Sequence, residues 1–127
     1  TAFAKRTDES LHELRKRVKY LWYHLRLLKE SWPRIFKSFG KEVHQLSDLL
    51  GEDHDLAVLK KRLPKFISNG NEKILMEKLY GNIMLRRTTL QDKAFPLAKK
   101  IYTEKPGKFT KRTFSYYQVA ISHIEKT

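Results

Sequence analysis

The chain has 127 residues, of which 27 are Lys or Arg and 14 are Asp or Glu, so its formal net charge at pH 7 is +13. A hydrophobic content of 40%, with 12% aromatic residues, is enough to form a core and excludes disorder driven by charge alone. No apolar run reaches the roughly 18–20 residues of a transmembrane helix. Without cysteine, the sequence also excludes a disulfide framework, a thiol nucleophile and a cysteine-based zinc site. A single cationic domain remains, and its partner is expected to be an anion.

The hydrophobic spacing predicts an all-α fold, because no stretch keeps the alternation of a strand. Helices are expected at residues 8–31, 34–50, 53–67, 71–102 and 108–126. Proline and glycine lie at the expected joints, and a break near Gly81 or a bend at Pro96 is left open within the fourth helix. Short links between long helices favour an antiparallel bundle.

The first helix carries the clearest pattern. Its apolar residues fall on one side, which predicts a core stripe. The stripe consists of Leu11, Leu14, Val18, Leu21, Leu25 and Leu28. The opposite side collects His12, Arg15, Lys16, Lys19, Tyr23 and Arg26, and only Glu30 interrupts it at the far end. Like charges four residues apart repel, so this face suits a bound anion better than plain solvation, although a solvated face is the alternative.

A second group of polar residues, Asp53-His54-Asp55, follows Gly51. Metal ligation by these residues together with His44 and Asp48 is one interpretation, but a single helical stretch cannot aim all of them at one point. Capping of a new helix by Asp53 or Asp55, with the other carboxylate orienting His54, is favoured. No metal, no cofactor and no catalytic constellation is therefore expected.

The last helix is expected to repeat the arrangement of the first. Lys108, Lys111 and Arg112 lie at its start, with Lys105 just before it, where the helix amides add positive potential. Phe114, Tyr117, Ile121 and Ile124 form its expected core stripe.

Three ordered blocks resemble the CHAD domain, the conserved-histidine α-helical domain. The first is matched by His12, Arg15, Lys16, Arg17, Lys19, Trp22 and Tyr23. The second is matched by Leu49, Leu50, Gly51, His54, Asp55, Leu56, Val58 and Leu59. The third is matched by Tyr102, Glu104, Lys105, Pro106, Phe109 and Arg112.

The resemblance implies two related helical-bundle halves and non-catalytic binding of inorganic polyphosphate in a basic groove. The blocks resemble the C-terminal half, so residues 1–127 are expected to form one helical domain or half-domain, with self-association or a second CHAD half as a further partner. A cytoplasmic location is expected, and association with polyphosphate granules is left open. The expected polyphosphate-binding residues are His12, Arg15, Lys16, Lys19, Tyr23, Arg26, His54, Lys105, Lys108, Lys111 and Arg112.

The main alternative is a helical module that binds RNA or single-stranded DNA, since the chain has rings that could stack on bases. Most of those rings fall on predicted core stripes, and Tyr23 is the only ring clearly on the first basic face. An accessory domain of a triphosphate-hydrolysing enzyme is a third alternative, but the chain lacks the acidic metal cluster that such hydrolysis needs. A membrane surface is not expected as the partner, because the apolar stripe suits a core.

Overall fold

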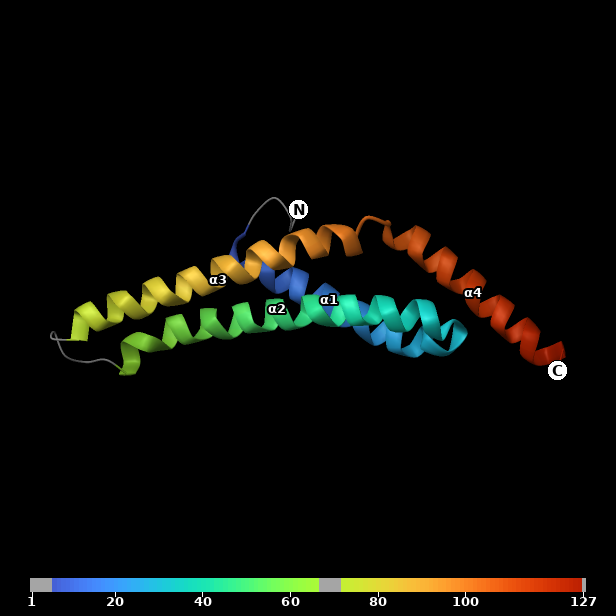
Figure 1. Cartoon of the computed structure of the whole chain (residues 1–127), viewed down its shortest axis with the longest axis horizontal. Coiled ribbons are helices and arrows are strands. Elements are labelled where there is room, and N and C mark those ends of the chain that lie inside the picture. The colour runs from blue at the N-terminus through green and yellow to red at the C-terminus, as the bar shows by residue number, and fades with distance from the viewer. Residues whose placement is uncertain (1–5, 67–71, 127) are drawn as a thin grey trace.

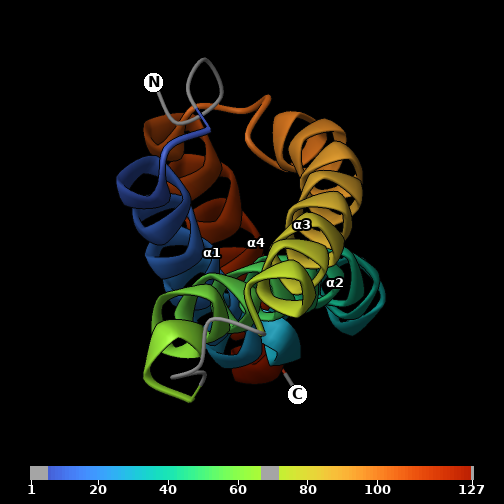
Figure 2. The ribbon, with the colours of Figure 1, turned by 90° about the vertical axis from the view of Figure 1, so that its left-hand side faces the viewer.

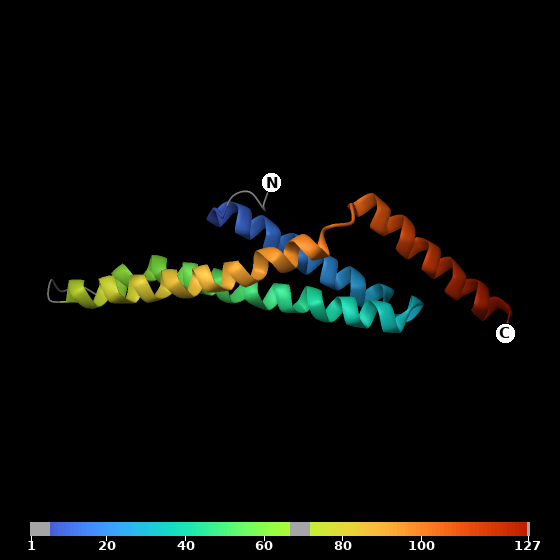
Figure 3. The same cartoon turned by 45° about the horizontal axis from the view of Figure 1, so that its top comes forward.

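Figure 1 shows the computed structural model, which describes residues 6–126 except 67–71. The described residues form four α-helices, α1 (Asp8–Leu28), α2 (Pro33–Phe66), α3 (Lys73–Ile101) and α4 (Pro106–Lys126), with a short 3-10 turn, η1 (Lys29–Ser31). The all-α prediction is confirmed. Helix α2 is central and packs against both α1 and α3, as Figure 2 shows, whereas α4 extends away from these three helices (Figure 3).

Helix α1 begins where the sequence favours a start. The Thr7 hydroxyl accepts a hydrogen bond from the Ser10 amide, and the Ser10 hydroxyl accepts one from the Thr7 amide, each at 3.1 Å. This reciprocal cap satisfies amides that the helix itself leaves without partners. Asp8 and Glu9 in the first turn add the negative charge that a helix N-terminus favours.

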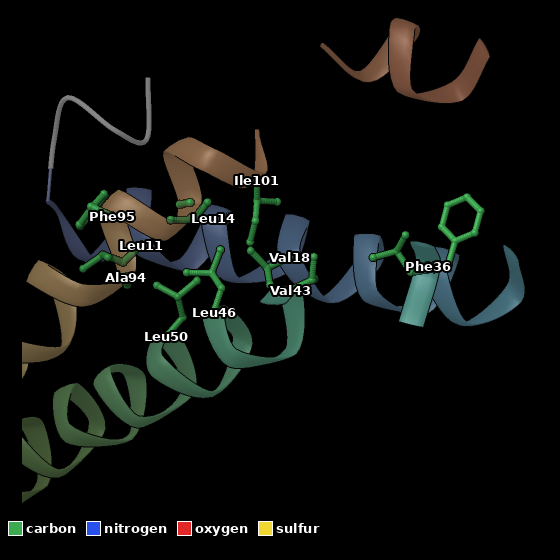
Figure 4. Close-up of a cluster of buried hydrophobic side chains, with 12 residues drawn as sticks. Leu11, Leu14, Val18, Phe36, Val43, Leu46, Leu50, Ala94, Phe95 and Ile101 are labelled. Carbon is green, nitrogen blue, oxygen red and sulfur yellow. The ribbon is translucent and has the colours of Figure 1, made fainter. Parts of the chain in front are cut away.

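The core stripe predicted for α1 is confirmed. Leu11, Leu14, Val18 and Leu25 are buried, while Leu21 and Leu28 are half-buried against the same cluster. Figure 4 shows this cluster between three helices, since side chains of α2 and α3 close over the α1 stripe. The contributing residues are Phe36, Val43, Leu46 and Leu50 of α2 and Ala94, Phe95, Ala98 and Ile101 of α3.

The predicted break at Gly51 is wrong, because α2 runs without interruption from Pro33 to Phe66 and includes Pro64. Glycine inside a helix costs about 1 kcal/mol relative to alanine, which packing can offset. Leu50 and Asp53, on either side of the glycine, are each only 2% exposed, so tertiary contacts hold the helix together there. Residue 67, the expected end of this segment, lies outside the described residues.

Helix α3 is also unbroken at Gly81, and it continues through Pro96 to Ile101. Figure 1 shows the helix changing direction in its orange second half, which contains Pro96. A proline inside a helix removes one backbone hydrogen bond and bends the axis, so a bend here follows from the sequence. Residue 71, its expected start, lies outside the described residues.

One buried ion pair links the three core helices. The Arg87 side chain of α3 is 7% exposed, and its Nε donates to the Asp53 carboxylate of α2 at 2.9 Å. A terminal nitrogen of Arg87 also donates to Asp8 of α1 at 3.0 Å, and the Gln91 amide donates to Asp53 at 3.1 Å. Asp53 is thus an interior residue of α2, and the prediction that it caps a helix is wrong. The hydrogen bond that Arg87 donates to Asp53 is the main cause that raises the pKa of Arg87 above its already high value.

The core stripe predicted for α4 is wrong. Phe114 is 57% exposed, Tyr117 is 47% exposed and Ile124 is 70% exposed. The helix instead attaches through a neighbouring side, where the Tyr116 ring meets Trp32 edge-on at 4.8 Å and Phe109 lies 6.2 Å from Phe39. The ring contacts of Tyr116 and Phe109, rather than the predicted stripe, therefore set the rotation of α4.

The buried pair gives a first prediction. Replacing Arg87→Met should lower the free energy of unfolding by about 3–5 kcal/mol, since it leaves Asp53 buried without its charged partner. The double variant Asp53→Leu with Arg87→Met should recover most of that loss, because no buried charge remains. Urea denaturation followed by circular dichroism measures both. A single variant within about 1 kcal/mol of the wild type would contradict this account.

Asp8 gives a second prediction. The hydrogen bond from Arg87 is the main cause that lowers the pKa of Asp8 below its usual 3.8, and the charges of Arg87, Lys61 and Lys60 add to it. A carboxyl whose pKa is lower in the folded state stabilises the fold above its unfolded pKa and loses that contribution as the pH falls through the folded value.

The free energy of unfolding of Asp8→Asn should therefore be lower than that of the wild type at pH 7, by under about 1 kcal/mol because the carboxylate is 59% exposed. The difference should shrink below pH 3.8, the usual pKa of the group. Parallel urea titrations at several pH values measure it, and a difference that stays constant into acid would overturn the assignment.

Candidate functional site

The basic side of α1 lies along its boundary with α2. The rings of His12 and His54 have centroids 6.2 Å apart, and those of Trp22 and His44 have centroids 5.3 Å apart. The second contact lies ten residues further along α1 and ten residues further back along α2, so the two helices run antiparallel in a constant register. We call this boundary the basic seam. It comprises His12, Arg15, Lys16, Lys19, Tyr23 and Arg26 of α1 with Gly40, His44, Ser47, Gly51 and His54 of α2.

On the α2 side of the seam, small residues lie opposite the long cationic side chains of α1. The register places Gly51 opposite Arg15, Ser47 opposite Lys19 and Gly40 opposite Arg26. A Cβ atom added at Gly40 or Gly51 would meet no atom within 4 Å. Open space therefore lies over the backbone of α2 at these points.

At the N-terminal end of α1 the seam opens into a pocket of about 290 Å³. His12, Arg15, His54 and Lys61 contribute basic groups to it. Arg15 Nε is buried and has no hydrogen-bond partner among the described residues. A buried donor without a partner costs about 1–3 kcal/mol, so an acceptor that reached it would be bound favourably.

Two of the three carboxylates that line the pocket are already engaged with Arg87. Both oxygens of Asp53 accept hydrogen bonds from it. Asp8 is bound to the same guanidinium. The third carboxylate is Glu9, an exposed residue in the first turn of α1. Asp8 and Asp53 therefore leave much of the positive potential of His12, Arg15 and Lys61 uncancelled.

Further along the seam the cations are exposed. Glu13 approaches Lys16 only at 3.9 Å, and Asp48 is directed to His44 at 3.3 Å. Arg26 lies over the Trp22 ring at 4.8 Å, a cation–π contact that orients its guanidinium without neutralising it. Tyr23 is 54% exposed beside Trp22. The result is an exposed row of donors from His12 to Arg26.

The basic residues at the start of α4 lie elsewhere. Lys105, Lys108 and Arg112 line a larger groove of about 1410 Å³ between α1 and α4, on the opposite side of α1 from the seam. Arg112 is held by Glu104 at 3.1 Å and stacks near the Phe109 and Tyr116 rings. Lys111 is exposed and does not line this groove. Ten of the eleven predicted residues therefore fall on two separate surfaces, with His54 joining the α1 set, and Lys111 lies on neither surface.

Some basic residues beside these surfaces were not predicted. Lys61 lines the pocket next to His12, and Arg17, His24 and Lys100 line the α1/α4 groove. His24, on the groove side of α1, is exposed. The helical spacing of His54 and Lys61, two turns apart on one face, is a signal that could have identified Lys61.

Among the described side chains, no group of three or more His, Asp or Glu residues is placed to hold a metal ion. In the same part of the chain, no helix is both long and apolar enough to cross a membrane.

Comparison with known families identifies the first half of the chain. The family model of the CHAD domain matches residues 1–64. Searches among curated proteins and among solved structures found no match. The matched residues include all of α1 and nearly all of α2, the two helices that build the basic seam. The α1/α4 groove draws much of its lining from beyond the match.

Proposed function

This chain belongs to the CHAD domain family, and we propose that it binds inorganic polyphosphate along the basic seam without catalysing a reaction. The observation that carries the proposal is the row of exposed cations on α1 facing the open backbone of α2. The row extends over about 21 Å from His12 to Arg26, at 1.5 Å per residue. A flexible chain with one negative charge per unit suits such an extended surface better than a compact anion does.

The seam residues have complementary roles in this proposal. Arg15 offers a fork of donors, including its buried Nε, to two phosphate oxygens. Lys16 and Lys19 act as mobile point charges. His12 and His54 meet from two helices and donate from the sides of the pocket, while Tyr23 and Arg26 extend the row.

The cations at the start of α4 form a secondary contact in this proposal. Lys105 and Lys108 lie on the opposite side of α1, so a short polyphosphate bound in the seam would not reach them. Their effect on affinity should therefore be small for short chains and larger for long ones.

Removing seam charge gives the third prediction. If about six phosphates are neutralised, log K should fall with log salt at a slope of about −4, taking −0.7 for each phosphate. The double variant Arg15→Ala with Lys19→Ala should bind more weakly and make the slope shallower by about 1.4. Isothermal titration with polyphosphate of defined length, at several salt concentrations, measures both quantities.

The matched control removes two charges far from the seam. Lys73→Ala with Lys78→Ala lies in the exposed first turns of α3 and should change the affinity much less. Equal losses from the two double variants would mean that the chain binds through diffuse charge. Competition addresses the nucleic-acid alternative, since single-stranded DNA of equal charge should displace polyphosphate poorly. Displacement as effective as that by polyphosphate itself would favour the alternative.

The open backbone opposite Arg15 gives the fourth prediction. Gly51→Ala should stabilise α2 by about 1 kcal/mol, because alanine is the better helix former and its methyl meets open space. The same methyl should occupy volume that the phosphate chain needs, so binding should weaken while stability rises.

Gly81→Ala is the matched control, since Gly81 also lies inside a helix with open space around it but away from the seam. It should give the same stabilisation and leave polyphosphate binding unchanged. Thermal denaturation and titration of both variants provide the comparison. Wild-type binding by Gly51→Ala would show that the chain does not approach α2 here.

A further inference from the structure

The α1/α4 groove differs from the seam in its floor. Among the described residues, helix α4 packs against the rest of the fold through one side. The contacts there are those of Tyr116 with Trp32 and Phe36 and of Phe109 with Phe39. Its next side faces the groove with Phe114 and Tyr117 exposed. Large exposed rings grouped over a groove are typical of an interaction surface.

Helix α1 supplies the opposite wall of this groove. Tyr20, 61% exposed, stands on that wall, and the half-buried Leu21, Leu28 and Phe39 lie deeper. The groove thus has an apolar floor between two long helices. Its volume of about 1410 Å³ exceeds the roughly 300–1,000 Å³ of sites for small ligands, so a segment of polypeptide fits it better.

The rim of the groove is cationic. Arg17 of α1, Lys100 at the end of α3, and Lys105 and Lys108 at the start of α4 line it, and none of them forms an ion pair with a described residue. The acidic Glu104 is occupied by Arg112. The charge on the rim therefore selects a partner that carries negative residues.

We propose that this groove docks an amphipathic helix of another protein, with an apolar stripe on the ring floor and Asp or Glu residues along both edges. A helix laid in a groove between helices presents anchors at positions i, i+3, i+4 and i+7, which suit the Tyr20, Phe114 and Tyr117 rings. A second copy of this chain fits poorly, because each copy has a net charge of +13 and the same basic rim.

Polyphosphate alone also fits poorly, because it offers no apolar surface to the rings. The docking surface does not rest on the proposed function, since seam and groove lie on opposite sides of α1. Mutation of the apolar groove floor should leave binding of short polyphosphate intact, and mutation of the seam should leave peptide binding intact.

The test uses the full chain and three synthetic peptides of about 18 residues, five helical turns each. One peptide has a Leu stripe edged by Glu, the second has the same stripe edged by Lys, and the third keeps Glu but replaces Leu with Ser. Fluorescence anisotropy should show binding of the Leu/Glu peptide, which weakens with salt, and at least tenfold weaker binding of the other two.

Variants on the floor should separate this surface from general charge. Phe114→Ser with Tyr117→Ser should weaken the Leu/Glu peptide at least tenfold, while the helical content by circular dichroism and the affinity for polyphosphate stay unchanged. Val119→Ser is the matched control, because Val119 is 70% exposed on the side of α4 away from the groove, and it should bind as the wild type does.

Three results would overturn the proposal. Equal binding of the Leu/Glu peptide and of the peptide with Ser in place of Leu would mean that the groove binds any polyanion and that its apolar floor has no role. Equal binding of the Leu/Glu and Leu/Lys peptides would show that the cationic rim does not select the partner. A concentration-dependent dimer in sedimentation, broken by the double Ser variant while no peptide binds, would make a second copy of this chain the occupant.

Discussion

The arrangement of the three core helices depends on one guanidinium. Arg87 enters from α3 and binds Asp53 of α2 and Asp8 of α1, so a single buried side chain connects the start of α1, the middle of α2 and the middle of α3. A charge buried without partners would be very costly, so this geometry strongly disfavours other registers of the three helices. It also satisfies Asp53, which lines the same pocket as His12 and His54, so this carboxylate leaves the basic groups of the pocket to attract an anion.

The features predicted well from the sequence are those that local periodicity determines. The Leu11 to Leu28 stripe of α1 continues over five turns, and an apolar stripe of that length is expected to be buried against another element. The opposite face carries charged side chains in the sequence, so it is predicted to face solvent or a ligand. Two of the three CHAD blocks fall on this helix and on α2, where the family match also lies.

The errors arose where a contact distant in the chain overrides a local preference. Gly51 and Asp53 look like a helix end and a cap, but Asp53 pairs with a residue 34 positions later, and the packing around Gly51 keeps α2 intact. Similarly, the apolar stripe of α4 suggests burial, but Tyr116 and Phe109 find aromatic partners just after the η1 turn and near the start of α2, and these contacts set the rotation of the helix. No window of local sequence contains either partner.

The same reasoning explains why the basic residues of the chain form two separate surfaces. In the sequence, Lys105 and Lys108 are grouped with the α1 cations only because they carry the same positive charge. The fold places them on the opposite side of α1 from Arg15 and Lys19. What then differs between the surfaces is the floor, bare helix backbone in the seam and aromatic rings in the groove. The positive charge attracts an anion to either surface. A floor of aromatic rings also stabilises a partner that buries apolar surface on it, by about 25 cal/mol per Å² buried. A polymer of phosphates can use only the first surface fully, and a helix with both acidic and apolar residues gains most at the second.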